Sequence, residues 1–206
     1  MTPTFTGEPV VGAIRGYRWW RVSAPGRLHS AWLDDEPWAA GSNEARCAAR
    51  ARRIDRRGWA RRHLSGIPSR DCTCGFYGLH RLPATPVDAA DAERPWLLDP
   101  ERWSGLAGRV VFGVAEAWGH ALIGTEGWRA RYCRPLALFV PKRSDLARSA
   151  RLELLVGAYG VAVVSDLTVL ASEWGPEPPA ESSSGTDPMR WNREDPEGPG
   201  GWISAT

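Results

Sequence analysis

Four residues in the first half of the chain carry side chains that bind transition metals. Two of them stand close together in the run Asp71-Cys72-Thr73-Cys74-Gly75. Thiolates and imidazoles are the usual ligands of tetrahedral zinc, and three cysteines with one histidine close such a site completely. The sequence therefore predicts a structural zinc site with the ligands Cys47, His63, Cys72 and Cys74.

Two alternatives to this metal site stay open at the level of the sequence. His63 comes just before the Cys-rich loop and His80 just after it, so either imidazole could be the fourth ligand. The cysteines could also be small buried apolar side chains, a common role for free cysteine. A catalytic zinc is not expected, because no general base accompanies the set. Cys133 is expected in the core.

A stripe of arginines is the second candidate site. Five of them recur at intervals of four, three, four and four residues, a spacing that places them along one face of a helix running from about residue 43 to 62. Such a stripe suits the phosphate backbone of a nucleic acid. The alternative is a solvated basic face that meets the acidic C-terminal segment of the same chain. The stripe consists of Arg46, Arg50, Arg53, Arg57 and Arg61.

The aromatic pair Trp19-Trp20 is the third candidate. Neighbouring residues on a strand face opposite sides of the sheet, so a sheet covered on one side would expose one of the two rings. An exposed ring could stack on a base of a single-stranded nucleic acid. The alternative is that the core covers both faces of this strand.

Composition limits the class of protein that these sites serve. The chain has 206 residues, 43% of them hydrophobic, and twelve tryptophans. Its mean hydropathy is −0.36. These values predict one globular domain. No apolar run approaches the ~20 residues that span a bilayer, and the N-terminus lacks the pattern of a secretory signal. A cytoplasmic location with reduced cysteines is therefore expected, without a membrane partner.

The elements that must position these sites read as α+β. A hairpin is predicted at 16–32 around the turn Ala24-Pro25-Gly26. A β-meander is predicted from 108 to 140, with its last two strands at 128–132 and 136–140, and a short strand at 161–164. Helices are predicted at 43–62, 145–159 and 165–174, the second capped by Ser144 and ended by Gly160, with a Cys-rich loop at 63–80 and a linker at 83–107 between the two halves. The fold class is a small twisted antiparallel sheet or partly open barrel with helices packed at one side.

Residues 173–206 differ in composition from the rest. They hold seven acids and two arginines among many Pro, Gly and Ser residues, which predicts a disordered acidic tail. Removing this tail from the formal charge of +2 leaves +7 on residues 1–172, which form the single predicted domain.

Five short pieces of the sequence are similar to a group of actinobacterial proteins that carry no assigned activity. The resemblance would cover residues 16–172 and implies a shared fold and a bacterial source, with no mechanism; the arginine-rich helix is extra to the pattern. The pieces are Arg18-Trp19-Trp20, Cys72-Thr73-Cys74-Gly75, Trp118-Gly119, Gly127-Trp128-Arg129-Ala130 and Tyr159-Gly160-Val161.

No nucleotide-binding loop or nucleophile elbow occurs in the sequence, so no catalytic residue is assigned. The expected function is a non-enzymatic cytosolic protein that binds nucleic acid or another polyanion through the arginine stripe and the aromatic strands. The alternative is a protein–protein adaptor whose basic stripe meets an acidic partner. An enzyme with a pocket between the sheet and the linker at 83–107 is a third interpretation. No oligomeric state follows from the sequence.

Overall fold

The two longest strands arise from the alternating apolar segments in the second half of the chain. In the computed structural model, β5 spans Val110–Ile123 and β6 spans Gly127–Phe139. The Gly124 N–H donates to the Gly127 carbonyl at 2.8 Å and closes the turn between them. The structure describes residues 12–31, 36–47, 63, 66–70, 72–82, 104, 109–124 and 126–177.

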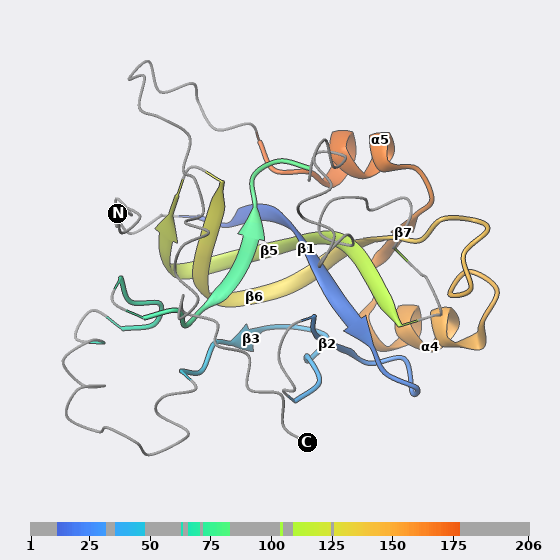
Figure 1. The fold of residues 1–206 in the computed structure, drawn as a ribbon, viewed down its shortest axis with the longest axis horizontal. Helices are drawn as coiled ribbons and strands as arrows, with labels where there is room; N and C mark the ends of the chain where they lie inside the picture. Colours follow the sequence, from blue (N-terminus) through green and yellow to red (C-terminus); the bar gives the residue numbers. More distant parts are fainter. Residues whose placement is uncertain are drawn as a thin grey trace, which may run out of the picture.

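The remaining elements are short and surround this long hairpin (Figure 1). A π-helical turn, Leu170–Trp174, follows directly on the last helix. The other strands and helices are β1 Ile14–Val22, β2 Leu28–Ser30, β3 Asn43–Glu44, β4 Phe76–Leu79, β7 Ala162–Val164, α4 Ala150–Tyr159 and α5 Leu167–Val169.

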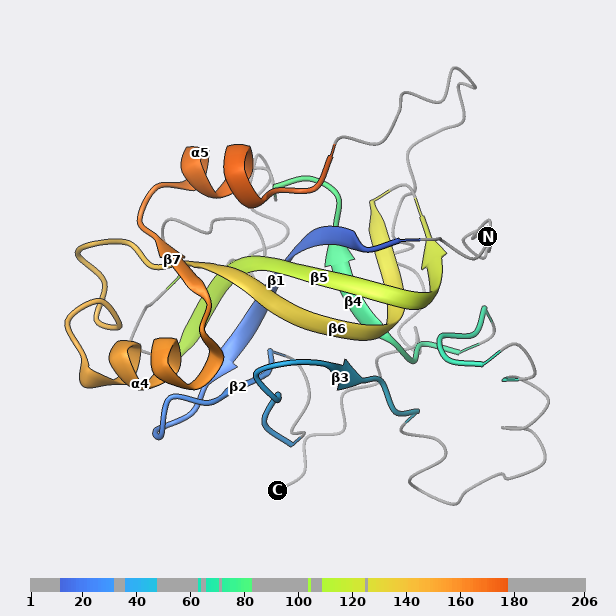
Figure 2. The same cartoon turned by 180° about the vertical axis from the view of Figure 1, so that it is seen from behind.

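Four strands close a ring of hydrogen bonds. β1 pairs with β5, β5 with β6, β6 with β4, and β4 returns to β1 through the pair Tyr17↔Leu79. This ring is not a true barrel, since a single residue pair completes it. β2 pairs with β1, and both β3 and β7 pair with β6. In the described sheet, β7 is parallel to its partner and the other pairings are antiparallel. Both helices lie toward the same end of the sheet (Figure 2). The predicted α+β class with a partly open antiparallel sheet is confirmed.

Apolar side chains fill both faces of the sheet. Trp20 and Trp128 lie in one cluster, together with Leu155 of α4. Trp19 lies in a second cluster on the opposite face, where Leu170 of the π-helical turn packs against the sheet. Trp19 is 3% exposed and Trp20 is fully buried, so the core covers both faces of β1.

The ring of Trp128 lies over two neighbouring strands, each of which carries a glycine beneath it. A Cβ atom on Gly16 would lie 2.4 Å from the Trp128 indole nitrogen, and one on Gly78 would lie 2.3 Å from the indole carbon Cζ2. Any side chain at either glycine would therefore overlap the ring. The indole N–H donates to the Arg15 carbonyl at 2.9 Å and fixes the ring over β1 and β4.

The predicted helix at 43–62 is wrong at its start, where tertiary contacts override helix propensity. Asn43 accepts a hydrogen bond from Ala39 N–H at 2.7 Å, and its amide donates to the Cys133 carbonyl at 3.2 Å. Glu44 bonds to Arg131 of β6 at 2.7 Å. Residues 43–44 therefore form a strand, and residues 45–47 follow it without helix. The rest of the predicted helix, residues 48–62, lies outside the described residues.

Two other predicted boundaries shift. The strands predicted at 128–132 and 136–140 are one continuous strand, β6, which passes through Pro135 where its register against β5 shifts. The predicted helix at 145–159 begins at Ala150, because Ser144 caps only a turn by accepting from Ala147 N–H at 3.2 Å. Gly160, in the left-handed region at φ 60°, ends α4 as predicted.

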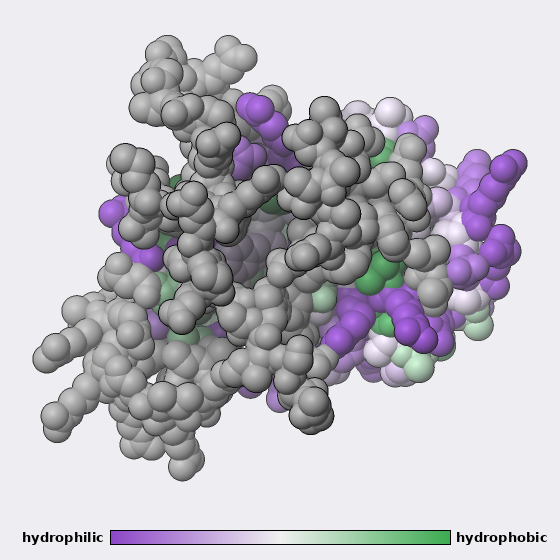
Figure 3. Space-filling view, in the orientation of Figure 1, coloured by the Kyte–Doolittle hydropathy of each residue, from purple (hydrophilic) through white to green (hydrophobic). Residues whose placement is uncertain are grey.

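The surface of the described part is charged around the connection from β6 to α4. In the space-filling view, hydrophilic residues gather over this loop at the right of the molecule (Figure 3). Lys142, Arg143 and Arg148 are exposed there.

Of the predicted linker at 83–107, the structure describes only Ser104. The predicted tail from residue 178 onward lies outside the described residues. Among the described helices, none has the length and apolar character needed to cross a membrane.

Candidate metal centre

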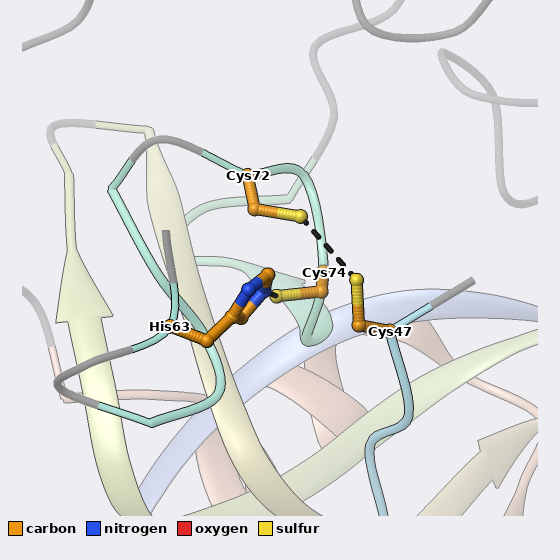
Figure 4. Close-up of side chains that lie close together, drawn as sticks. All are labelled: Cys47, His63, Cys72 and Cys74. Carbon is orange, nitrogen blue, oxygen red and sulfur yellow. Dashed lines mark hydrogen bonds between the residues drawn. The ribbon is translucent and has the colours of Figure 1, made fainter. Parts of the chain in front are cut away.

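Three separate segments bring the four predicted metal ligands together (Figure 4). Their ligand atoms all lie within 4.8 Å of one another. The sulfurs of Cys47 and Cys72 are 3.6 Å apart, and His63 Nε2 lies 3.2 Å from the Cys74 sulfur. We call Cys47, His63, Cys72 and Cys74 the metal cluster; these residues could bind a metal such as zinc.

Two of the distances in the metal cluster are close to those of a tetrahedral site. Bonds of ~2.3 Å to sulfur and ~2.0 Å to nitrogen place the ligand atoms of a tetrahedral zinc ion ~3.5–3.8 Å apart. The two short distances in the cluster are close to this edge length. They are also much longer than the ~2.05 Å bond of a disulfide, and all four cysteines of the chain are free thiols.

Strand β6 sets the positions of the cysteines. β3 pairs with β6 through Glu44↔Tyr132, and Ala45 N–H then donates to the Arg131 carbonyl at 2.8 Å, which carries the chain to Cys47. β4 pairs with the preceding part of β6 through Phe76↔Ala130, directly after the Cys-X-Cys run. Both strands follow the same edge of β6, so their cysteines meet beside it.

His63, rather than His80, completes the cluster. Its side chain is buried, at 7% exposure, and a turn closed by the Gly66 N–H donating to the His63 carbonyl at 2.9 Å follows it. His80 Nε2 instead lies 3.1 Å from the Gly124 carbonyl, at the turn between β5 and β6. The second histidine therefore belongs to the hairpin and not to the metal cluster.

The thiols of the cluster are difficult to deprotonate when no cation is present. Burial raises the pKa of the Cys74 thiol to about 12; a hydrogen bond from the Ser69 backbone opposes this rise, and the neighbouring Cys72 and Cys47 add to it. Three thiols this close resist losing their protons together, because each thiolate disfavours the next. A divalent cation at the centre supplies the charge that reverses this preference.

The residues predicted for polyanion binding fall in different places. Arg46 is exposed beside Cys47 of the metal cluster, and its guanidinium lies 3.7 Å from the Glu36 carboxylate. The other four arginines of the stripe lie outside the described residues. Trp19 and Trp20 are both buried, so the predicted role of one of these rings in base stacking does not fit the structure. Cys133, as predicted, lies in the core.

Sequence reasoning missed two residues next to the cluster. Arg129 donates to the carbonyl of Cys72, and the hydroxyl of Tyr77 donates to the carbonyl of Thr73. The two residues face each other in the pairing of β4 with β6. The sequence indicates that Arg129 lies on a strand next to Trp128. It does not indicate that this strand pairs with β4 so that Tyr77 faces Arg129.

Comparison of the chain with protein-family models, with curated proteins and with solved structures found no match.

Proposed function

We propose that the chain is a zinc-binding protein whose ion has a structural role. The observation that carries this proposal is the metal cluster, in which three sulfurs and one imidazole nitrogen lie within 4.8 Å of one another. Four protein ligands fill a tetrahedral shell and leave no position for water or substrate, which is the arrangement of structural sites rather than catalytic ones.

The zinc prediction is tested by metal analysis of the purified protein. We expect about one zinc per chain after purification without chelator, since structural sites of this ligand type bind tightly. Replacement of Cys74 by serine should abolish it. Elemental analysis that finds no zinc, iron or other transition metal in the wild-type protein, and no uptake on addition of zinc, would contradict the proposal.

The metal cluster also suggests what the ion holds in place. Cys47 and His63 stand at the two ends of residues 48–62, which contain seven arginines and one aspartate. We call this stretch the arginine segment. An ion bound by both residues ties the ends of the arginine segment to the edge of β6. The exposed Arg46, one residue before Cys47, adds to the same basic region.

A second proposed function follows from this arrangement. The arginine segment binds nucleic acid or another polyanion, and the zinc ion anchors it to the sheet. Neutralised phosphates release counterions, so affinity should fall steeply with salt and depend little on base sequence. The alternative is a protein–protein adaptor, in which the same segment meets one acidic partner and binding saturates with that partner alone.

Two substitutions test the polyanion proposal. Changing Arg53 and Arg57 to alanine should weaken binding to single- and double-stranded oligonucleotides of any sequence. It should also lower the slope of log affinity against log salt by about one unit for each phosphate that an arginine no longer neutralises. Fluorescence anisotropy at several salt concentrations measures both quantities.

The matched control for this test removes the same charge elsewhere. Arg143 and Arg148 are exposed in the loop between β6 and α4, and their double change to alanine should alter the slope much less. If the wild-type protein ignores DNA and RNA even at low salt, the polyanion proposal fails and the adaptor takes its place. Equal effects of the two double variants would show general charge attraction without a site in the arginine segment.

A further inference from the structure

The Cys-X-Cys run is bent where it meets the metal cluster. In an extended strand, the Cα atoms of residues i and i+2 lie ~6.6 Å apart, and the bend helps to bring the ligand atoms of the cluster within 4.8 Å of one another. The chain bends at Cys72 and again at Gly75, which adopts φ 117°, before β4 begins. Glycine permits this conformation but does not select it, so other contacts must hold the bend.

Two side chains hold consecutive carbonyl groups of the bend. Arg129 donates from Nη1 to the carbonyl of Cys72, and Tyr77 donates from its hydroxyl to the carbonyl of Thr73. The peptide groups between the two sulfur ligands are therefore tied to neighbouring strands. We call Arg129 and Tyr77 the carbonyl clamp.

The two members of the clamp also support each other. They are direct partners in the pairing of β4 with β6, and the guanidinium carbon of Arg129 lies 5.8 Å from the centre of the Tyr77 ring. Arg129 is 5% exposed, so its position is set by the strands around it. Tyr77 is 44% exposed, so its position depends on the hydrogen bond to the Thr73 carbonyl and on the contact with Arg129.

We infer that Tyr77 and Arg129 are positioning residues of the metal centre. They fix the carbonyls of Cys72 and Thr73 so that the sulfurs of Cys72 and Cys74 point to one centre in the folded protein. The inference rests on the proposed zinc function. Its consequence is that metal affinity depends on two residues that donate no ligand atom, as happens where groups outside the ligand set orient it.

The first test is the variant Tyr77→Phe, which deletes the hydroxyl and keeps the ring under Arg129. Zinc affinity, measured by competition with a chromophoric chelator, should fall about tenfold. The absorption of the cobalt(II)-loaded protein should change in its sulfur-to-metal charge-transfer region, because that region reports how many thiolates are bound and in what geometry. A merely destabilised protein with an intact site would not show this spectral change.

The matched control is Tyr132→Phe, which deletes a hydroxyl on β6 that lies 3.5 Å from the Glu44 carboxylate. Its affinity and cobalt spectrum should match those of the wild type. Arg129→Lys, which retains a donor for the Cys72 carbonyl, should bind zinc more tightly than Arg129→Met. Near-ultraviolet circular dichroism with saturating zinc shows whether each variant is folded.

The possible outcomes separate the clamp from the metal site itself. If the wild type binds neither zinc nor cobalt, the zinc function and the clamp are both wrong. If the wild type binds zinc and Tyr77→Phe binds it equally well with an unchanged cobalt spectrum, the clamp alone is wrong. A loss of zinc affinity in Tyr77→Phe that comes with an altered cobalt spectrum and is absent from Tyr132→Phe supports it.

Discussion

Removal of the metal should lower the melting temperature of the protein by roughly 8–16 °C. An ion present at a thousand times its dissociation constant stabilises a folded protein by about 4 kcal/mol. For a chain of this size, each kcal/mol corresponds to about 2–4 °C. Chelation and the variant Cys74→Ser should both produce the shift, because both leave the three segments of the metal cluster without their common ion. Differential scanning calorimetry with matched zinc and chelator measures it.

The control for metal removal is Cys133→Ala. Cys133 is as buried as Cys47 but lies in the core cluster, away from the metal cluster, with Arg18 as a polar neighbour. This variant should lose a little stability by leaving a small cavity, keep its full metal content and retain its response to chelator. A melting temperature that chelator does not change in the zinc-loaded wild type would contradict a structural role for the ion.

Gly78→Ala should destabilise the protein by about 3 kcal/mol, at the upper end of the usual cost of overpacking a core. A Cβ atom at this position would lie 2.3 Å from the buried ring of Trp128. The ring has little freedom to move away, because it is only 2% exposed in the core and its N–H is bonded to the Arg15 carbonyl. Urea denaturation measures the loss of unfolding free energy.

The same substitution elsewhere should have the opposite sign. Gly157 lies in α4, and a Cβ atom there would have no neighbour within 4 Å. Gly157→Ala should therefore stabilise the protein by about 0.5–1 kcal/mol through helix propensity. In a double variant, Trp128→Phe should restore part of the stability that Gly78→Ala removes. Equal effects of the two glycine substitutions would contradict the packing described for Trp128.

Much of the sheet was predictable because its signals are local. The alternation in β5, the glycine turn before β6 and the Ala24-Pro25-Gly26 turn after β1 each specify structure over a few residues. The sequence predicts two strands where β6 is one, and Pro135 lies between them, a residue that normally ends a strand. It is tolerated here because the register of β6 against β5 shifts at that point, and such irregularities accommodate residues that an even ladder excludes.

The candidate site was predictable in its residue types and not in its support. Cysteine and histidine are the usual ligands of zinc, so the four members of the metal cluster could be predicted from the sequence. The choice of His63 over His80 as the fourth ligand could not be secured from the sequence, because both histidines lie close to the two cysteines along the chain. What separates them is that His80 is held at the turn between β5 and β6, a contact with no local signal. The strand at Asn43 was missed for the same reason, since its partners lie on β6.

The pairing of both β3 and β4 with one edge of β6 has a consequence for the order in which the chain folds. The β5–β6 hairpin closes from neighbouring residues, but β3 and β4 must each find β6 across a long stretch of chain. The entropy cost of closing such a loop grows with its length, and distant pairings of this kind slow folding. The ligands Cys47, His63, Cys72 and Cys74 are near one another in sequence and can meet on an ion before β6 is in place. Bound early, the ion would join the two short strands into one unit, so that β6 completes a single docking step instead of two.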